Sequence, residues 1–318
     1  MSNRVLVQIK DVKKYFPYND GFRTKSVKAV DGVSLNIYEG EALGLVGESG
    51  CGKSTLGRVA LRLLDKTDGS VLFDGHDIYS MRTSELMNSR KEMQIVFQDP
   101  YACLNPRMRV EDIIAEPLKF HHVRNPERKH AVKEILSKVG LSEDMGKRFP
   151  HELSGGQQQR VGIARALVLR PKFIVCDEAV SALDVSVQAQ ILNLLTQLKD
   201  EYGLTYLFIS HNLSVVHHMC NRIAVMYLGQ IVEIADRETI FKHPQHPYTK
   251  ALVSAVLTVD RKQKNERVVL TDDLPSPINP PSGCRFHIRC NCMNDECKLQ
   301  VPQLREIEPE HYVACLHA

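Results

Sequence analysis

The sequence lacks any long hydrophobic run. No apolar stretch among its 318 residues approaches the roughly 20 residues that a transmembrane helix needs. The start of the chain also lacks the apolar core of a secretory signal peptide, because Lys10, Asp11 and Lys13 interrupt it. We therefore expect a cytosolic chain, whose connection to any membrane is made through partner proteins.

An excess of charge of either sign is missing as well. The 41 Lys and Arg residues nearly balance the 38 Asp and Glu residues, which gives a formal net charge of +3. This balance argues against a nucleic-acid-binding surface and against a polybasic membrane anchor. What remains is an ordinary globular composition, 43% hydrophobic and 25% charged, in a chain long enough for one large or two moderate domains.

The chain is organised around a glycine-rich loop at residues 47–54. It reads G-E-S-G-C-G-K-S and matches the phosphate-binding pattern G-x-x-x-x-G-K-[ST] of P-loop NTPases. Apolar residues predict a buried strand at 41–47 and an amphipathic helix at 54–64, the flanks that such a loop requires. Backbone N–H groups and Lys53 would bind phosphate, and the Ser54 hydroxyl would bind Mg²⁺. The predicted nucleotide ligands here are Gly47, Glu48, Ser49, Gly50, Cys51, Gly52, Lys53, Ser54 and Thr55.

A second predicted anion site precedes the helix expected at residues 157–169. Ser154, Gly155, Gly156 and Gln157 stand at the start of this helix. The exposed N–H groups and the dipole of a helix N-terminus attract anions by the same physics as the first loop. One chain thus carries two phosphate-binding segments.

Polar residues follow three predicted core strands. Asp177 and Glu178 end the apolar strand 172–178, where Asp177 suits Mg²⁺ and Glu178 can polarise a water in line with the γ-phosphate. Gln98 ends the strand 93–98 and can reach Mg²⁺ or that water, although most such glutamines only cap a strand. His211 follows the strand 205–210 and can contact a γ-phosphate oxygen, although a lone histidine there is more often structural.

The remaining segments predict the organisation around these motifs. Residues 110–148 show helical patterns without a strand signal, which indicates an inserted helical subdomain. Two strand-like runs flank Gly229, and we expect the sheet to close there. The segment 16–22 has turn chemistry and predicts a loop. Phe22 lies at about the right distance before residue 47 to stack on a nucleotide base. Tyr15, Phe16 and Tyr18 compete for that role, and the plain alternative is a partly buried loop aromatic.

These motifs occur in the order found in ATP-binding cassette (ABC) ATPases, which the chain resembles over residues 1 to about 235. The resemblance rests on the P-loop, Gln98, L-S-G-G-Q at 153–157, C-D-E at 176–178, S-A-L-D at 181–184 and His211. The L-S-G-G-Q signature is nearly diagnostic of the family. Segments 97–107, 243–249 and 275–284, with the cysteine-rich tail, narrow the resemblance to the oligopeptide/dipeptide importer branch and extend it over the whole chain.

The resemblance implies an α/β fold with a P-loop (RecA-like) core, an antiparallel β subdomain and an inserted helical subdomain. It places the ABC ATPase domain at 1–235, with the helical subdomain at about 100–170. A loop-rich, cysteine-containing extension follows at 236–318, where prolines at 275–281 predict an extended connector.

The resemblance also implies an ATPase that works as a head-to-tail pair. ATP would lie between the P-loop of one subunit and residues Ser154–Gln157 of the other. Glu178 would be the general base or water-orienting carboxylate, and His211 would contact the γ-phosphate. The implied partners are a second ATPase subunit, two membrane-spanning permease subunits and an extracytoplasmic peptide-binding protein, at the cytoplasmic face of the membrane. Two alternatives stay open: an importer ATPase for nickel chelates or glycosides, and a soluble ABC ATPase of DNA repair or translation. The latter usually carry coiled-coil insertions or two cassettes, which this chain lacks.

The cysteines concentrate near the end of the chain. In a cytosolic chain an odd, clustered set indicates metal binding before disulfides. The C-x5-C-x6-C-x17-C spacing resembles the tail of the importer branch, where four cysteines hold a [4Fe–4S] cluster. A Cys₄ set also suits Zn²⁺, and a tail without metal is the third possibility. The expected ligands are Cys284, Cys290, Cys297 and Cys315, with Cys292 as the spare.

Overall fold

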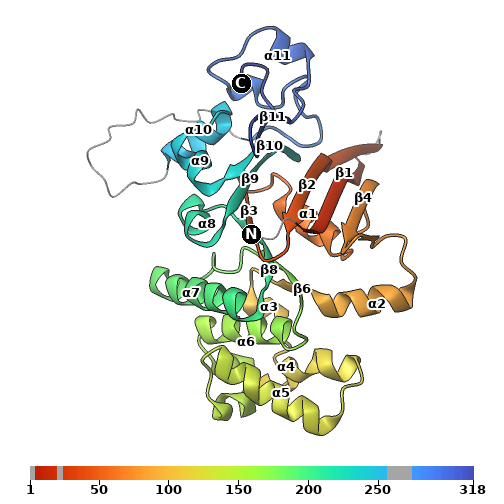
Figure 1. Cartoon of the computed structure of the whole chain (residues 1–318), viewed down its shortest axis with the longest axis vertical. Helices are drawn as coiled ribbons and strands as arrows, with labels where there is room; N and C mark the ends of the chain where they lie inside the picture. Colours follow the sequence, from red (N-terminus) through yellow and green to blue (C-terminus); the bar gives the residue numbers. More distant parts are fainter. Residues whose placement is uncertain (1–3, 20–23, 256–273) are drawn as a thin grey trace. The chain divides into compact units, whose positions relative to one another are not determined.

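A computed structural model describes residues 4–19, 24–255 and 274–318 (Figure 1). Phe22 lies outside these ranges, so its predicted stacking on a base stays a prediction. The chain divides into two compact units. The first comprises residues 1–80 and 208–318, and the second comprises residues 81–207. Each unit is described by itself.

The first unit contains an antiparallel sheet with the strand order β2-β1-β4-β5. Alternating apolar residues of β1, such as Val7 and Ile9, are buried against the core. β1 continues to Asn19, through part of the segment that the sequence predicted as a loop, because it pairs with β2 as far as Asn19 and Thr24. The strands are β1 (Val5–Asn19), β2 (Thr24–Tyr38), β4 (Asp68–Phe73) and β5 (His76–Asp77).

A second set of strands in the first unit has the order β11-β12-β10-β9-β3. β3 is buried along its whole length and runs parallel to β9. The expected closure of the sheet after residue 233 is wrong, because β10 pairs with β12 of the C-terminal extension. The strands are β3 (Ala42–Val46), β9 (Arg222–Tyr227), β10 (Gln230–Asp236), β11 (Arg305–Glu308) and β12 (His311–Val313).

Helices complete the first unit. Helix α8 packs so closely on β3 that a Cβ atom at Gly44 would lie 2.3 Å from Val216 Cγ1. The P-loop lies between β3 and α1, as the sequence predicts. The helices are α1 (Lys53–Ala60), α8 (Leu213–Met219), α9 (Arg237–Lys242), α10 (Pro247–Ser254) and α11 (Glu296–Leu299), with a 3₁₀ turn at His287–Arg289.

The second unit has two parallel strands, β6 (Met93–Val96) and β7 (Phe173–Asp177), and is otherwise helical. Helices α4, α5 and α6 lie side by side in Figure 1, and their apolar residues, including Ile114 and Leu136, are buried. Residues 110–148 contain no strand, which matches their helical pattern. The helices are α2 (Thr83–Glu92), α3 (Pro100–Cys103), α4 (Val110–Phe120), α5 (Asn125–Lys138), α6 (Gly155–Leu167) and α7 (Val185–Tyr202). Strand β8 (Thr205–Ser210) then leads from the second unit into the first.

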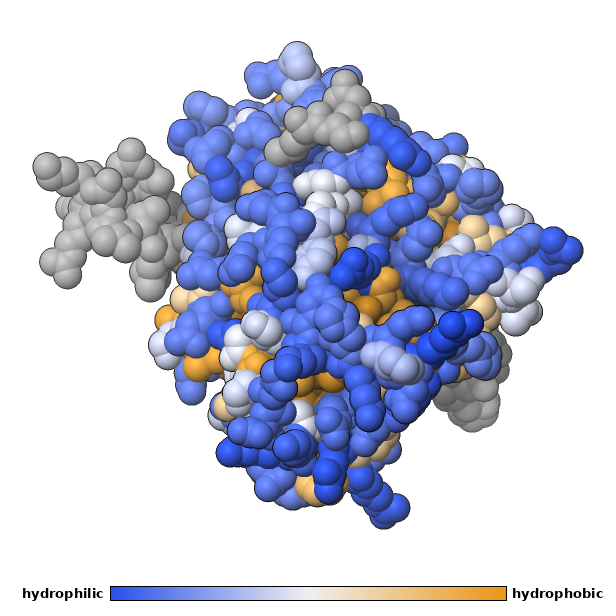
Figure 2. All heavy atoms as spheres, turned by 60° about the horizontal axis from the view of Figure 1, so that its bottom comes forward, coloured by the Kyte–Doolittle hydropathy of each residue, from blue (hydrophilic) through white to orange (hydrophobic). Residues whose placement is uncertain are grey.

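The surface is mostly polar in the view of Figure 2, where hydrophilic residues dominate and apolar residues appear in separate areas. Among the helices of residues 4–19, 24–255 and 274–318, none combines the length and the apolar character needed to cross a membrane.

Candidate nucleotide-binding site

The backbone of the P-loop depends on glycine at the start of α1. Gly52 caps this helix with φ of 109°, a left-handed conformation that side chains disfavour. A Cβ atom at this position would lie 2.0 Å from the Ala29 carbonyl oxygen. Ser49 and Gly50, in the middle of the loop, are exposed. The loop therefore has the tight backbone and the open surface that phosphate binding requires.

Lys53 folds back onto the loop that carries it. Its side chain is buried, and Nζ donates hydrogen bonds to the carbonyl oxygens of Gly47 at 2.8 Å and Glu48 at 2.9 Å. An ammonium group has three donors and no acceptor, so phosphate oxygens can take the place of these carbonyls. Lys53 thus has both the charge and the position for a phosphate ligand.

The back of the P-loop rests on residues that the sequence analysis missed. The Glu48 N–H donates to the Tyr248 hydroxyl at 2.9 Å, and the Glu48 carboxylate lies 3.1 Å from Arg289 Nη1 through both oxygens. The Gly229 N–H donates to the Cys51 carbonyl at 2.8 Å. Tyr248 lies in the 243–249 segment that carried the importer resemblance, which was the one available signal for it.

In the second unit, the end of β7 brings acidic and amide groups together. Asp177 ends this buried strand and is itself only 3% exposed. Glu178 follows with φ of 49°, and its Oε2 accepts a hydrogen bond from Gln98 Nε2 at 3.0 Å. The structure therefore places Gln98 beside Glu178, and both groups could act on one water molecule or metal ion.

The signature segment begins α6 with a capping box. The Ser154 hydroxyl accepts the Gln157 N–H at 3.4 Å, while Gln157 Oε1 accepts the Ser154 N–H at 2.9 Å. Ser154 and Gly155 are exposed at this end. A Cβ atom on Gly156 would lie 2.6 Å from Val187 Cγ1 of α7. Close packing on α7 thus fixes a helix N-terminus that faces solvent.

His211 follows β8 directly and is exposed. Asn212 then caps α8, its side chain accepting the N–H groups of Ser214 and Val215. The predicted γ-phosphate contact therefore lies at the end of a core strand, as its position in the sequence suggests.

The predicted metal ligands of the extension do not form a metal site. Cys297 Sγ lies 3.5 Å from His317 Nε2, and Cys315 Sγ accepts the His317 N–H at 3.4 Å. Burial, together with the neighbouring cysteines, raises the pKa of Cys284 to about 11, which favours the neutral thiol. Within the described ranges, no group of three or more His, Cys, Asp or Glu residues is placed to hold a metal ion. The structure therefore does not support the predicted [4Fe–4S] cluster or zinc ion on Cys284, Cys290, Cys297 and Cys315.

Comparison with known proteins extends over the whole chain. A family model described as ABC transporter matches residues 30–181, and one described as Oligopeptide/dipeptide transporter, C-terminal region, matches residues 232–297. The oligopeptide transport ATP-binding protein AppF of Bacillus subtilis is 52% identical, over 99% of this chain and 98% of that protein. A putative peptide import ATP-binding protein of Brucella ovis is 48% identical, over 99% of both chains.

Solved structures show the same fold. The ATP-binding cassette MJ0796, a dimer in a post-hydrolysis state bound to ADP and Pi, aligns with a TM-score of 0.64 and 32% identity, over 73% of this chain and 98% of that chain. CbiO1 of Clostridium perfringens, part of an ABC transporter complex, aligns with a TM-score of 0.66 and 27% identity, over 76% of this chain and 92% of that chain.

These findings define a P-loop ATPase with the ATP-binding cassette fold, which confirms the predicted α/β architecture. The chain belongs to the ABC transporter family, whose cassettes dimerise, hydrolyse ATP and work with membrane permease components.

Proposed function

We propose that this chain is the ATP-hydrolysing subunit of an importer of oligopeptides or dipeptides, bound peripherally to permease subunits at the cytoplasmic face of the membrane. The observation that carries this proposal is the match of residues 232–297 to the C-terminal region of oligopeptide/dipeptide transporters. Relatives named for peptide transport or import, about 50% identical over nearly the whole chain, support it.

The residues divide the work of hydrolysis as follows. The P-loop and Lys53 bind the phosphates, and Glu178 orients and polarises the attacking water with Gln98 beside it. His211 contacts the γ-phosphate. Mg²⁺ prefers hydroxyl, amide and carboxylate oxygens as ligands. Ser54, Gln98 and Asp177 would supply these oxygens. The bound Mg²⁺ would add positive charge at the phosphates.

The second half of each ATP site comes from the neighbouring cassette. Ser154–Gln157 of one subunit would bind the nucleotide held by the P-loop of the other. The capping box supports this role, because it keeps the start of α6 in helical form before any nucleotide arrives.

Cargo and partners are tested in one experiment. The tagged chain should co-purify with two multi-span membrane proteins and, with an extracytoplasmic binding protein, support ATP-dependent uptake of peptides into vesicles. Uptake of nickel chelates or glycosides instead of peptides would overturn the cargo assignment. Absence of any membrane partner would overturn the transport function.

The chemistry of hydrolysis is tested with Glu178→Gln. This change keeps the size and the hydrogen-bonding reach of the side chain but removes its basicity. We expect ATP turnover to fall by about 100-fold or more, with ATP affinity retained. Turnover near that of the unmodified protein would remove Glu178 from the role of general base.

The [4Fe–4S] cluster of the extension is kept as a separate proposal. Its support is the spacing of the four cysteines in the sequence, since the described residues gather no metal-binding group. A brown protein whose thiolate-to-iron absorbance disappears in Cys297→Ser would establish it. A colourless protein that contains stoichiometric zinc would show that the bound metal is zinc and not iron.

A further inference from the structure

We propose that the C-terminal extension forms a fixed wall of the P-loop, and that Arg289 and Tyr248 are positioning residues which set the charge and the shape of that loop for ATP. This inference rests on nucleotide binding by the P-loop, one part of the proposed function, and is independent of the cargo. The contacts that carry it all lie within the first unit.

The first contact concerns charge. The Glu48 carboxylate belongs to a loop that must bind a polyanion, and negative charges held close together repel one another. Arg289 Nη1 lies 3.1 Å from both carboxylate oxygens and so offsets that charge. The Arg289 side chain is only 4% exposed, so water screens the pair weakly. Removing Arg289 would leave the negative charge of Glu48 uncompensated within the P-loop.

The second contact concerns shape. The Tyr248 hydroxyl accepts the Glu48 N–H at 2.9 Å, which fixes the peptide plane at the beginning of the loop. Packing restricts the position of the Tyr248 side chain, because it is buried in an aromatic cluster with Tyr227 and Phe286. The ring centroids in this cluster lie 4.7 to 5.5 Å apart. The cluster joins β9 to two parts of the extension, α10 and the segment around Phe286.

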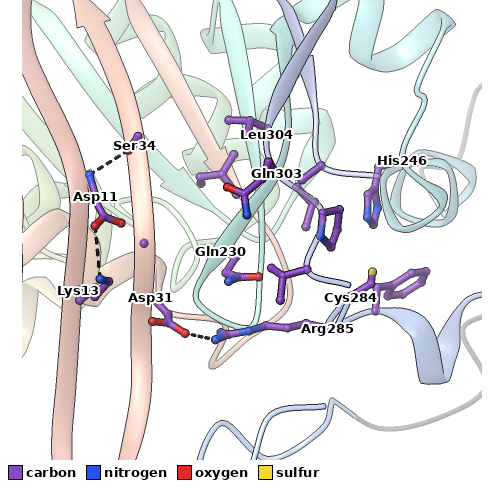
Figure 3. Close-up of a pocket in the computed structure, with 17 residues that line it drawn as sticks. Asp11, Lys13, Asp31, Ser34, Gln230, His246, Cys284, Arg285, Gln303 and Leu304 are labelled. Carbon is purple, nitrogen blue, oxygen red and sulfur yellow. Dashed lines mark hydrogen bonds and ion pairs between the residues drawn. The ribbon is translucent and has the colours of Figure 1, made fainter. Parts of the chain in front are cut away.

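A second contact of the extension, made by Arg285, supports the later part of the P-loop. Arg285 donates to the Leu228 carbonyl and pairs with Asp31, and Figure 3 shows it extended from beside Cys284 toward Asp31. Asp31 and Arg285 both line a cavity of about 440 Å³. The next N–H group, that of Gly229, donates to the Cys51 carbonyl. The extension thus holds the P-loop directly at Glu48 and through the β9–β10 turn at Cys51.

The charge contact predicts effects of opposite sign from the two partners. In the full-length chain, we would measure ATP affinity by displacement of a fluorescent ATP analogue. Arg289→Gln should weaken ATP binding by about fivefold or more. Glu48→Gln keeps the backbone N–H of this loop residue, removes only its negative charge and should bind ATP more tightly, and the double variant should return to within about twofold of the unmodified chain. Loss of packing alone would not produce this recovery.

Control variants distinguish an effect of the extension on ATP binding from a general loss of stability. Lys133 and Glu143 form an exposed ion pair at 2.8 Å in the second unit, so Lys133→Gln removes the same charge elsewhere and should leave affinity unchanged. Tyr248→Phe, which removes only the acceptor for the Glu48 N–H, should also weaken ATP binding. In steady-state hydrolysis Arg289→Gln should raise KM for ATP and change kcat little.

The proposal is overturned if folded Arg289→Gln binds ATP as tightly as the unmodified chain, or if Glu48→Gln fails to restore its affinity. Should Arg289→Gln not fold, Glu48→Gln alone decides, since a folded variant that binds ATP no more tightly than the unmodified chain contradicts the charge argument. Lys53→Ala identifies a different failure. If this variant binds ATP normally, the nucleotide site itself has been assigned wrongly.

Discussion

At the scale of single residues, the site depends on positions where no side chain fits. Gly52 has its Cβ direction blocked by the Ala29 carbonyl, and Gly156 has its own blocked by Val187. The first clash is with backbone and cannot be relieved by a second substitution. The second clash is with a side chain that can be shortened, so substitutions at Gly156 and Val187 test how α6 packs on α7.

Gly156→Ala should therefore destabilise the fold by about 1–3 kcal/mol, because the new methyl group would lie 2.6 Å from Val187 Cγ1. Val187→Ala removes that obstacle and should recover most of the loss. The free energy of unfolding of the two single variants and the double variant checks this. If Gly156→Ala lowers the free energy of unfolding equally with and without the Val187→Ala change, the two helices separate freely and the contact with Val187 is not the cause of the loss.

Local motifs made most of the site visible in the sequence. The P-loop and the signature are short runs whose function depends on adjacent residues, so their positions could be predicted directly. Tyr248 and Arg289 could not be found in this way. They lie 200 and 241 positions from Glu48 along the chain, and only the fold brings them to the loop.

At the scale of secondary-structure elements, α10 begins at a buried histidine. His246 Nδ1 accepts the Tyr248 N–H at 3.1 Å, so the helix is capped by the neutral ring. Burial, with a smaller effect of Lys250, lowers the pKa of His246 to about 3. The unfolded chain binds a proton here near pH 6.5, and the folded chain does not.

Stability should therefore fall as the pH falls from about 6.5 toward 3, since protons favour the unfolded chain in this window. Between pH 6.5 and 5.0 this residue should cost about 1.5 kcal/mol of unfolding free energy. His246→Asn keeps a capping side chain without titrating, and should lose that part of the pH dependence. His130→Asn, on the exposed face of α5, is the control and should retain it.

Element boundaries were predicted less well than element types. Helical periodicity placed α4 and α5 because their buried faces are clear in the sequence. The ends of β1 and of the sheet were wrong because pairing decides them. β1 continues where β2 offers hydrogen bonds, and β10 is covered by a strand from a segment about 80 residues further on.

At the scale of the whole molecule, each chain carries two motifs that we propose to be different half-sites. The P-loop lies in the first unit and the signature in the second. In the proposed arrangement, a complete site needs the P-loop of one cassette and the signature of another. Activity should then depend on association.

Turnover per chain should accordingly fall on dilution, as the cassette pair dissociates by mass action. The measurement is the specific ATPase rate over a wide range of protein concentration, at saturating ATP. A rate that stays constant down to the most dilute samples would mean that a single chain hydrolyses ATP alone.

The carboxylate of Glu233 has a consequence for any attempt to reduce this protein to a minimal cassette. It is fully buried, and it accepts the N–H groups of Gln245 and His246 and contacts His311 Nε2 at 2.8 Å. A fragment that stopped at residue 235 would keep the charge and discard all three of these partners. It would also uncover the edge of β10, a template for aggregation. We expect such a truncated chain to precipitate, so the last quarter of the sequence cannot be treated as an appendage.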